Sequence, residues 1–457
     1  MTWTDDLARE ISGQVSTDHA ARAAMGTDFG RIVARMPQAV VRPASAEDVA
    51  HVVRFAAQHG LAVATRGGGH SQSGQSLSDQ IVLDMTSLDQ VFGVGEDVVT
   101  VQAGIKWRAV VDRLAPERLA PPVLTNNLDV TVGGTLSTGG LGVASWRYGT
   151  QADNCAELEV VTGTGDIVRC SEGANRPLFD AVRCGVGQFG VITEAVLNVR
   201  RYSPCYRSFY LLYDDLGALL DDLKMVMVDE RFDYLEAWCV PCPQGFKHVA
   251  GQHQPFAQWF FPLHATVETA EANAPEAAEK LAGLKFYKHV YTEGGEVAEF
   301  FTRLDTLFAL WRRGGYWDYM HPWMEGVLPW QTTGGYISQI LAHLPPQALV
   351  GGHILLWPAR GAASRVPLFL RPPSEFLMGF GILPAVPPAF INEVLPRLRL
   401  ASQALGMAGG KRYLSGWIDF DHEAWKAHFG EQWAAVTMAK QKFDPQGILN
   451  PDFVKFG

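Results

Sequence analysis

The residues best suited to chemistry lie at positions 66–71 and consist of Arg66, Gly67, Gly68, Gly69, His70 and Ser71. Three consecutive glycines leave backbone N–H groups bare, so a polyanion such as a phosphate can lie against them. Arg66 adds a fixed positive charge suited to a pyrophosphate. His70 is the one nucleophile of this run. The same residues also fit a plain glycine-rich surface turn with an incidental histidine, and the local pattern leaves both interpretations open.

A second glycine-rich run lies at residues 131–142 and reads Thr-Val-Gly-Gly-Thr-Leu-Ser-Thr-Gly-Gly-Leu-Gly. Small residues alternate there with hydroxyl-bearing and apolar ones. Such a segment can pack flat against a ring system and bind it through backbone groups and hydroxyls. A buried crossing of two chain segments is the alternative interpretation of the same pattern.

The elements that must position the first run follow a strand–helix–strand order. Ser45 is a suitable N-cap, acidic residues follow it in the first turn, and Gly60 is a suitable stop. Between them, apolar residues recur at helical spacing, namely Val49, Val52, Val53, Phe55 and Ala56. Strands are predicted at residues 61–65 and 81–84, on either side of the glycines. Because the glycines lead into a strand, the pattern is not a Rossmann fingerprint.

Periodicity predicts further elements on both sides of the second run. Strands are expected at residues 39–42, 98–103, 157–162 and 167–170, and helices at residues 4–11, 106–114 and 178–182. Another strand is expected after the segment Gly-Gln-Phe-Gly at residues 187–190.

Composition narrows the classes of partner. The chain has 457 residues, a net charge of −10 and no block rich in lysine or arginine, which argues against nucleic acid and anionic membranes as partners. Residues 1–15 are partly acidic and lack the apolar core of a signal peptide. No apolar run is long enough for a membrane span. These observations predict a cytoplasmic protein without a membrane partner.

The six cysteines favour a structural role. Four of them stand alone in the sequence, as buried free thiols do: Cys155, Cys170, Cys184 and Cys205. Cys239 and Cys242 form a CxxC pair, but zinc would need a second pair, and a thioredoxin-type site would need a different context. No metal site is predicted, and a redox role of the pair stays the alternative.

The segment 41–84 resembles the flavin-binding half of the FAD-linked oxidases of the vanillyl-alcohol-oxidase and berberine-bridge-enzyme type, also called PCMH-type. Those families carry Arg-Gly-x-Gly-His-Ser here, with the histidine bonded to the 8α-methyl carbon of FAD. The resemblance implies a covalent FAD on His70. It implies a single attachment, since Asn127 stands where doubly tethered members have a cysteine.

Residues 127–200 resemble the cytokinin dehydrogenases of the same superfamily, and the likeness continues in patches to the C-terminus. The shared motifs are TVGGTLS at 131–137, the run at 157–171, GQFGVIT at 187–193, FDYLE at 232–236, HPW at 321–323, KRYL at 411–414, WKAHFG at 425–430 and FDPQGIL at 443–449. The resemblance implies an α+β fold with two lobes. Residues 1–200 and 411–457 would hold FAD, and residues 201–410 would form an antiparallel sheet flanked by helices that covers it.

The resemblance also assigns the residues that hold the cofactor. Besides His70, they are Arg66, Gly67, Gly68, Gly69, Ser71, Gln75, Thr131, Gly133, Gly134, Ser137, Leu141, Ile192, Tyr413 and Asn450.

The departures concern catalysis. Asn126 stands where cytokinin dehydrogenases have an aspartate, and a carboxamide can hydrogen-bond a substrate but cannot titrate near neutral pH. Tyr148 stands where the family has a histidine. Candidates for the proton acceptor are Tyr148, Asp129 and Glu236, each of which also fits a structural role. An aromatic run could line a flat pocket or simply form core: Trp311, Tyr316, Trp317, Tyr319, Trp323 and Trp330.

The resulting hypothesis is an FAD-dependent oxidase or dehydrogenase, of the kind that tailors secondary metabolites. It would act on a carbon bearing O–H or N–H of a small organic substrate. Such a protein transfers a hydride to flavin N5 and passes electrons to O₂ or another acceptor. Two alternatives stay open. One is amine oxidation as in cytokinin dehydrogenases, which Asn126 disfavours, and the other is a flavin-binding protein with weak catalysis.

Overall fold

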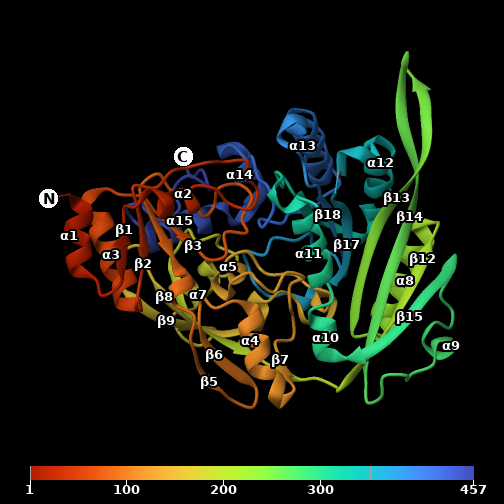
Figure 1. Ribbon diagram of the computed structural model, residues 1–457, viewed down its shortest axis with the longest axis horizontal. Coiled ribbons are helices and arrows are strands. Elements are labelled where there is room, and N and C mark those ends of the chain that lie inside the picture. The colour runs from red at the N-terminus through yellow and green to blue at the C-terminus, as the bar shows by residue number, and fades with distance from the viewer. Residues whose placement is uncertain (1, 350) are drawn as a thin grey trace.

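The computed structural model of the protein describes residues 2–349 and 351–457. Helices and sheets are mixed, in agreement with the predicted α+β class. Two smaller sheets are built from the first 200 residues, and a large sheet is built mainly from residues 205–383 (Figure 1). The C-terminal helices lie beside the N-terminal region in this view, far from the large sheet's outer strands.

The first small sheet carries the first glycine run between two parallel strands. Its strands, in spatial order, are β1 (Gln14–Ser16), β2 (Ala39–Arg42), β4 (Ile81–Asp84) and β3 (Val63–Arg66). The pairs β2–β4 and β4–β3 are parallel, so the chain after β3 has to turn back before it enters β4. Helices α1 (Trp3–Glu10) and α2 (His19–Ala24) precede β2.

Helix α3 (Ala46–His59) joins β2 to β3 as the sequence predicts. The side chain of Ser45 accepts a hydrogen bond from the N–H of Asp48, and acidic residues occupy the first turn. Gly60 ends the helix with φ of 63°, a left-handed conformation that glycine adopts without strain. The predicted apolar positions of the helix are buried against the sheet.

The second small sheet is antiparallel. Its order is β5 (Val91–Val94), β6 (Val98–Gln102), β10 (Val191–Asn198), β8 (Cys155–Val161) and β9 (Ile167–Ser171). The helices of this region are α4 (Trp107–Leu114), α5 (Val132–Leu136), α6 (Ser145–Tyr148) and α7 (Arg176–Val182). A separate two-stranded sheet pairs β7 (Leu119–Ala120) with β11 (Arg200–Arg201), which follows β10 after one residue. The hairpin at 157–170 is confirmed, whereas the start of the second glycine run forms the short helix α5, which was not predicted.

The large sheet has eight strands and is antiparallel in every pair. Its order is β15 (Lys288–Glu296), β12 (Cys205–Tyr213), β14 (Gln252–Thr269), β13 (Tyr234–Val249), β17 (His353–Arg360), β18 (Phe376–Leu383), β16 (Met324–Pro329) and β19 (Lys411–Arg412). One face packs apolar side chains against α8 (Leu216–Asp229), α12 (Trp330–His343) and α13 (Ile391–Met407). The opposite face is the one that bears Glu236 and Glu325.

The remaining helices connect these layers. They are α9 (Ala277–Lys280), α10 (Val297–Phe301), α11 (Asp305–Arg313), α14 (His422–Phe429) and α15 (Trp433–Phe443). Single turns of 3-10 helix lie at Met85–Ser87, Ala115–Glu117, Ala152–Asn154, Tyr316–Asp318, Pro346–Leu349, Gly361–Ala363, Pro388–Phe390 and Gly430–Gln432. Within the described residues no helix combines the length and the apolar character needed to cross a bilayer.

Strands β13 and β14 continue past the sheet as a two-stranded arm, which projects from the upper right of Figure 1. Beyond residue 239 the two strands pair only with each other, and their turn lies at residues 250–251. The CxxC pair sits at the base of this arm, with Cys239 buried in the sheet and Cys242 exposed on the arm.

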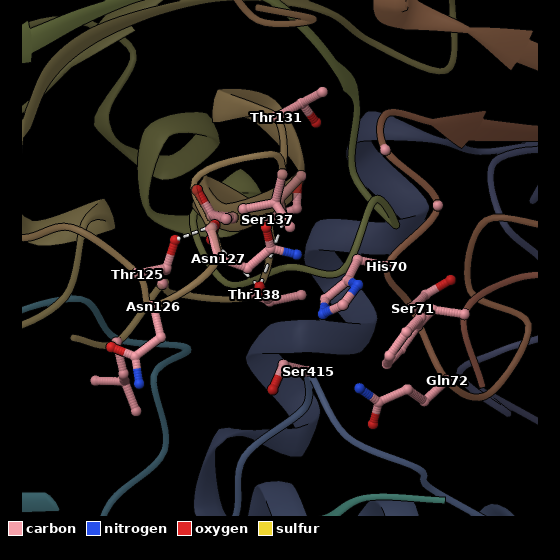
Figure 2. A pocket seen from close by; sticks show the side chains of 18 of the residues that line it. His70, Ser71, Gln72, Thr125, Asn126, Asn127, Thr131, Ser137, Thr138 and Ser415 are labelled. Carbon is pink, nitrogen blue, oxygen red and sulfur yellow. Dashed lines mark hydrogen bonds between the residues drawn. The ribbon is translucent and has the colours of Figure 1, made fainter. Parts of the chain in front are cut away.

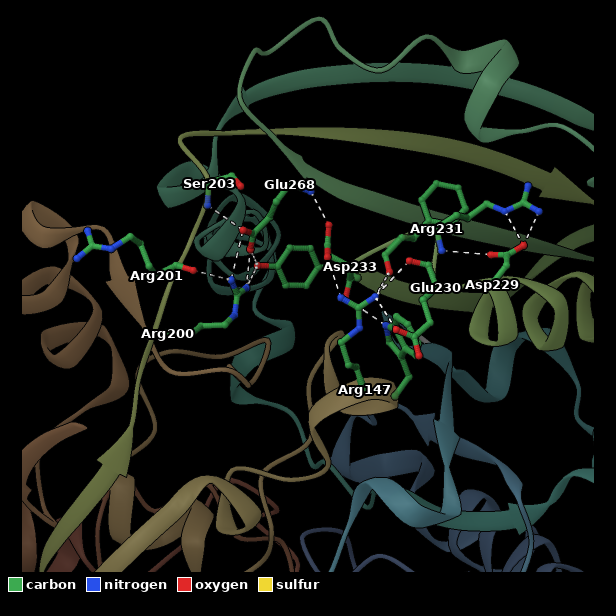
Figure 3. Close-up of polar contacts among 12 residues, drawn as sticks. Arg147, Arg200, Arg201, Ser203, Asp229, Glu230, Arg231, Asp233 and Glu268 are labelled. Atoms are coloured by element: carbon green, nitrogen blue, oxygen red, sulfur yellow. Dashed lines mark hydrogen bonds and ion pairs between the residues drawn. The ribbon is translucent and has the colours of Figure 1, made fainter. Parts of the chain in front are cut away.

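A group of ion pairs joins the large sheet to the first 200 residues (Figure 3). Arg200 donates hydrogen bonds to Glu268 of β14 and to the hydroxyl of Tyr234 of β13. Arg147 of α6 donates to Asp233, just before β13. These contacts tie the end of the first region to the two central strands of the large sheet.

Candidate functional site

A cavity of about 310 Å³ is lined by both glycine runs and by the large sheet. Strand alternation explains how the large sheet contributes to the lining. His353, Leu355 and Trp357 occupy every second position of β17, and all three face the cavity. Glu236 of β13 and Glu325 of β16 also line it. The predicted cofactor segments are thus brought together in one enclosure with residues of the large sheet.

The first glycine run presents unpaired backbone donors. In the described part of the chain, no acceptor receives a hydrogen bond from the N–H groups of residues 68–71. Gly67 is required by close packing, since a methyl group there would come within 2.0 Å of the Thr131 hydroxyl. Gly69 has φ of 65° and lies against the Arg66 side chain, so a larger residue would be strained there. The run therefore has the properties of an anion cradle.

His70 points into the cavity (Figure 2). Its ring stacks on Phe29 with centroids 4.1 Å apart and meets the ring of Trp323 edge-on at 5.6 Å. Burial, together with the nearby His321, lowers the pKa of His70 to about 3. Neither ring nitrogen takes part in a hydrogen bond within the described residues, so a neutral imidazole with a free lone pair faces the cavity.

The loop that carries His70 is held from behind by Asp28. The carboxylate of Asp28 accepts hydrogen bonds from the Ser71 hydroxyl at 2.9 Å and from the N–H of Gly74 at 2.8 Å. Burial raises the pKa of Asp28 in spite of these donors. Gln75 accepts from the N–H of Ser73 and donates to the carbonyl of Leu414, which fixes the loop to the C-terminal segment.

Arg66 is not among the described residues that line the cavity. Burial lowers the pKa of its guanidinium, and the carboxylates of Asp28 and Asp84 lie close enough to oppose that shift. Among the described residues, the one hydrogen bond of its guanidinium goes to the Ser76 hydroxyl, at 3.5 Å. The structure therefore places Arg66 as a charge beside the loop, where it can act on an anion through its field, and its direct contact with the cofactor stays a prediction.

The second glycine run forms another wall of the cavity. The predicted residues that line it here are Thr131, Gly133, Gly134, Ser137, Leu141 and, from β10, Ile192. A methyl group on Gly133 would come 3.0 Å from the Ala103 side chain, so glycine permits this close approach. Tyr413 also lines the cavity, and its hydroxyl accepts a hydrogen bond from the N–H of Gly140.

Asn450 joins the C-terminal return to the first sheet. Its side chain accepts from the N–H of Thr65 at 3.3 Å and donates to the carbonyl of Val186 at 3.2 Å. Gly187 has φ of 72°, and a methyl group there would lie 2.2 Å from the Asn450 amide. Lys440, buried on α15, donates to Asp444 and to the carbonyls of Gln188 and Leu449, which fixes both flanks of this contact.

Asn126 and Glu236 meet at the other end of the cavity. The amide nitrogen of Asn126 donates to Glu236 Oε1 at 2.7 Å, and its amide oxygen accepts from Arg303 at 2.7 Å. Arg303 also lies 3.5 Å from Glu236 Oε2. The three side chains form a closed polar group at the cavity wall, and Glu236 is 3% exposed.

Two candidate proton acceptors lie outside the cavity lining. Tyr148 is on α6, with the Arg200 guanidinium 5.8 Å from its ring centre. Asp129 is paired with Arg108, whose Nε lies 3.0 Å from the carboxylate. Of the predicted aromatic run, Trp311, Trp317 and Trp323 line the cavity, and the other three members do not.

Several residues of the site were not predicted from the sequence. Phe29, Asp28, Arg303, His353, Glu325 and Ser415 all lie in or against the cavity. Arg303 is a single polar residue in the turn between α10 and α11, and it belongs to no motif. Two motifs gave nearby signals, because HPW at 321–323 leads into β16 and Glu325, and KRYL at 411–414 ends directly before Ser415.

These features fit FAD. A dinucleotide needs bare amides for its diphosphate, which residues 68–71 provide, and a flat enclosure for its ring, which the second glycine run provides. His70 offers an unpaired imidazole at the same wall.

Comparisons with known proteins lead to the same cofactor. Residues 37–171 match a family model described as an FAD binding domain, and residues 206–455 match one described as "Cytokinin dehydrogenase 1, FAD and cytokinin binding". The chain is 32% identical to a Rhodococcoides fascians protein named "Uncharacterized oxidoreductase ORF5 in fasciation locus", over 97% of this chain and 99% of that one. It is 30% identical to cytokinin dehydrogenase 4 of Oryza sativa subsp. japonica, over 97% and 90% of the two chains.

The cavity and these matches define the class of protein, which is that of the FAD-dependent oxidoreductases. More narrowly, the chain belongs to the oxidoreductase family that includes the cytokinin dehydrogenases, because one family model covers more than half of it. The resemblance seen in the sequence motifs is thereby confirmed.

Proposed function

We propose that the protein binds FAD covalently through His70 and oxidises a carbon bearing N–H or O–H of a small, flat organic substrate. The single observation that carries this proposal is the continuity of one cavity from the unpaired His70 ring to the Asn126–Glu236–Arg303 group. Bound FAD supplies the hydride acceptor, and O₂ or another acceptor takes up the electrons afterwards.

The chain's own residues have separable tasks in this proposal. Backbone N–H groups of residues 68–71 hold the diphosphate, and the second glycine run holds the flat ring. Asn126 orients Glu236, and Glu236 accepts the proton that leaves the substrate heteroatom. Aromatic and aliphatic side chains exclude water from the space between them, among them Phe308, Trp311 and Leu355.

The replacement of an acidic residue by Asn126 fits this division of labour. Two carboxylates in direct contact would have to share a proton, whereas an amide can donate to Glu236 and leave it a single carboxylate. Arg303 holds the amide oxygen and so fixes which end of Asn126 faces Glu236.

Amine oxidation of the cytokinin dehydrogenase kind is the second candidate. The match of residues 206–455 to a family described by FAD and cytokinin binding favours it, and Asn126 disfavours it. A flavin-binding protein with weak catalysis is the third candidate, with Asn126 as the mark of lost activity. We also propose that residues 1–200 and 411–457 form the FAD-binding lobe and residues 201–410 the covering lobe. The cytoplasmic location stays a prediction from the sequence.

Covalent attachment is tested by acid precipitation of the purified protein. The yellow colour is expected to stay with the polypeptide, because an imidazole–carbon bond survives denaturation. His70→Ala is expected to release flavin under the same treatment, although the cavity can still bind it before denaturation. His59→Ala is the matched control, since His59 lies at the end of α3 outside the cavity lining. A colourless wild-type pellet would falsify the covalent bond.

The substrate class is tested by anaerobic mixing with candidate amines and alcohols. Bleaching of the visible flavin band by one of them identifies an oxidoreductase of that chemistry. Bleaching by an isoprenoid adenine identifies the second candidate function. Retention of the full band with every compound, in a protein that does carry flavin, supports the third.

A further inference from the structure

A carboxyl group without a role in the proposed mechanism lines the cavity beside the C-terminal segment. Glu325, the second residue of β16, is 8% exposed and belongs to the cavity wall. Ser415 lines the same cavity, and its hydroxyl donates to Glu325 Oε2 at 2.8 Å. Within the described part of the chain this is the one hydrogen bond of the carboxyl group, so Oε1 is left for a ligand.

The carboxyl group has no ionic partner among the described residues. Arg412 is close, but its guanidinium donates to the Ser402 hydroxyl, to the carbonyl of Trp417 and to the backbone carbonyl of Glu325. Tyr413 is the other titratable neighbour. A carboxylate removed from water without a paired charge favours its neutral form, and burial raises the pKa of Glu325 to about 7.

The other elements packed around Glu325 contribute no charge. On β18 the residue opposite is Gly381, where a methyl group would lie 3.4 Å from Glu325 Cγ. Trp357 of β17 covers Gly381, and Leu405 of α13 packs against Gly326, the residue after Glu325 on β16. A methyl group on Gly416 would lie 3.3 Å from Oε2. The carboxyl group thus lies at the cavity wall without an ion-pair partner among the described residues, and the nearby charge of Arg412 lowers its pKa less than burial raises it.

We propose that Glu325, oriented by Ser415, is a further ligand-binding residue of the active site. Its carboxylic acid group donates a hydrogen bond to an acceptor atom on the edge of a flat ring bound in the cavity. The inference rests on the proposed flavin site. A heterocyclic cofactor and a heterocyclic substrate both carry such acceptors, as carbonyl oxygens or ring nitrogens. Because only the protonated acid can donate, this contact is present below about pH 7 and lost above it.

The test is a titration of the holoenzyme's visible flavin absorbance from about pH 5 to about pH 9, without substrate and then with adenine as a probe that cannot be oxidised. A Glu325-dependent change with a midpoint of about 7 is expected in the wild type. It should vanish in Glu325→Gln, which keeps the shape but not the titration. Glu423→Gln is the matched control, because it makes the same charge change on the exposed surface of α14.

Ser415→Ala provides a second variant that leaves Glu325 in place. It removes a donor to the ionised carboxylate, so the midpoint is expected to move to higher pH. This variant tests the pair even where Glu325→Gln lowers the yield of folded protein.

The two sources of the acceptor give different results. If the flavin spectrum without adenine changes with pH, the acceptor lies on the cofactor. If only the affinity for adenine changes with pH, the acceptor lies on the substrate. A yellow wild type in which neither quantity differs from Glu325→Gln overturns this inference and leaves the proposed function intact. A wild type without flavin overturns both.

Discussion

At the scale of single residues, Asn126 and Glu236 carry the chemistry proposed for this chain. Both ends of the Asn126 amide are engaged, one by Glu236 and one by Arg303. Such a fully used amide fixes the direction of the carboxylate beside it. The group is compact enough that its members can be tested one at a time.

Glu236→Gln is expected to lower kcat for the eventual substrate by about 10²–10⁴, the usual contribution of a positioned proton acceptor. The flavin content and the visible spectrum should stay close to the wild type, because Glu236 lies at the far end from the amide cradle. The measurement is steady-state turnover with flavin quantified in each preparation. An unchanged kcat would show that the proton leaves by another path.

Asn126→Asp brings two carboxylates into contact at the wall of the cavity. The variant is expected to lose about 1–3 kcal/mol of unfolding free energy at alkaline pH, and to recover part of it on acidification as one carboxyl takes a proton. Urea denaturation at two pH values measures this. Equal losses at both pH values would contradict the argument.

Glu325 gives a stability prediction of the opposite kind. Burial raises the pKa of its carboxyl from 4.5 to about 7, so its neutral form stabilises the fold fully below about pH 4.5, and that stability is lost as pH rises through about 7. Glu325→Gln cannot ionise and should escape this loss, which amounts to about 3 kcal/mol. Denaturation curves of the two proteins should therefore diverge with rising pH in favour of the variant. Parallel curves would count against a neutral Glu325.

How far these residues could be foreseen depends on how they reach the site. His70, Thr131 and Gly133 lie in local glycine patterns whose spacing already indicates a ligand. Arg303 comes from the turn between α10 and α11 and Glu325 from a strand, and only the tertiary fold brings them to the cavity. No periodicity in the sequence reports such a meeting, because it depends on sheet order and not on spacing.

At the scale of elements, the C-terminal helix α15 fixes the far wall of the cofactor cavity. Lys440 is buried on this helix and bonds Asp444 at 2.7 Å as well as two backbone carbonyls. Burial lowers the pKa of Lys440, while Asp444 opposes that shift. The helix thereby holds Gln188 and Leu449, on either side of the Gly187–Asn450 contact.

Lys440→Met is expected to lower the unfolding free energy by about 3–5 kcal/mol, because it leaves the Asp444 carboxylate buried without its partner. The flavin of the variant should also become more accessible, which quenching of flavin fluorescence by iodide would report. Lys442→Met changes an exposed lysine of the same helix and serves as the control. Equal behaviour of the two variants would refute the anchoring role.

Elements with complete local signals were the ones that the sequence could predict. Helix α3 has a cap, an apolar stripe and a glycine stop, and its observed bounds follow from them. Helix α5 has neither length nor propensity, and it forms because its first residues bond the carbonyls of Ile105 and Ala103. The continuation of β13 and β14 beyond the sheet likewise has no signal in the hydrophobic pattern.

At the scale of the whole molecule, the junction at Arg200 couples the large sheet to the rest of the chain (Figure 3). The glutamate it bonds, Glu268, also accepts from the N–H of Ser203 at 2.9 Å, so one carboxylate ties three segments. Residues from both sides of this junction line the cavity. The rigidity of the junction therefore affects the geometry of the site as well as the stability of the fold.

Arg200→Met is expected to lower the unfolding free energy by about 3–5 kcal/mol and to separate the melting of the two regions. Differential scanning calorimetry should then show two transitions for the variant, whereas the wild type should show a single transition. Arg201→Met alters the next, exposed arginine and is the control. A single sharp transition in Arg200→Met would contradict the coupling.

The β13–β14 arm has a practical consequence of its own. Its tip at residues 250–251 is exposed and lies outside the cavity lining. Chain termini, fluorescent labels or small inserted domains are tolerated best at such tips. The arm therefore offers a site for circular permutation or for attaching a reporter. A break in the chain there would leave the segments that line the flavin cavity uncut.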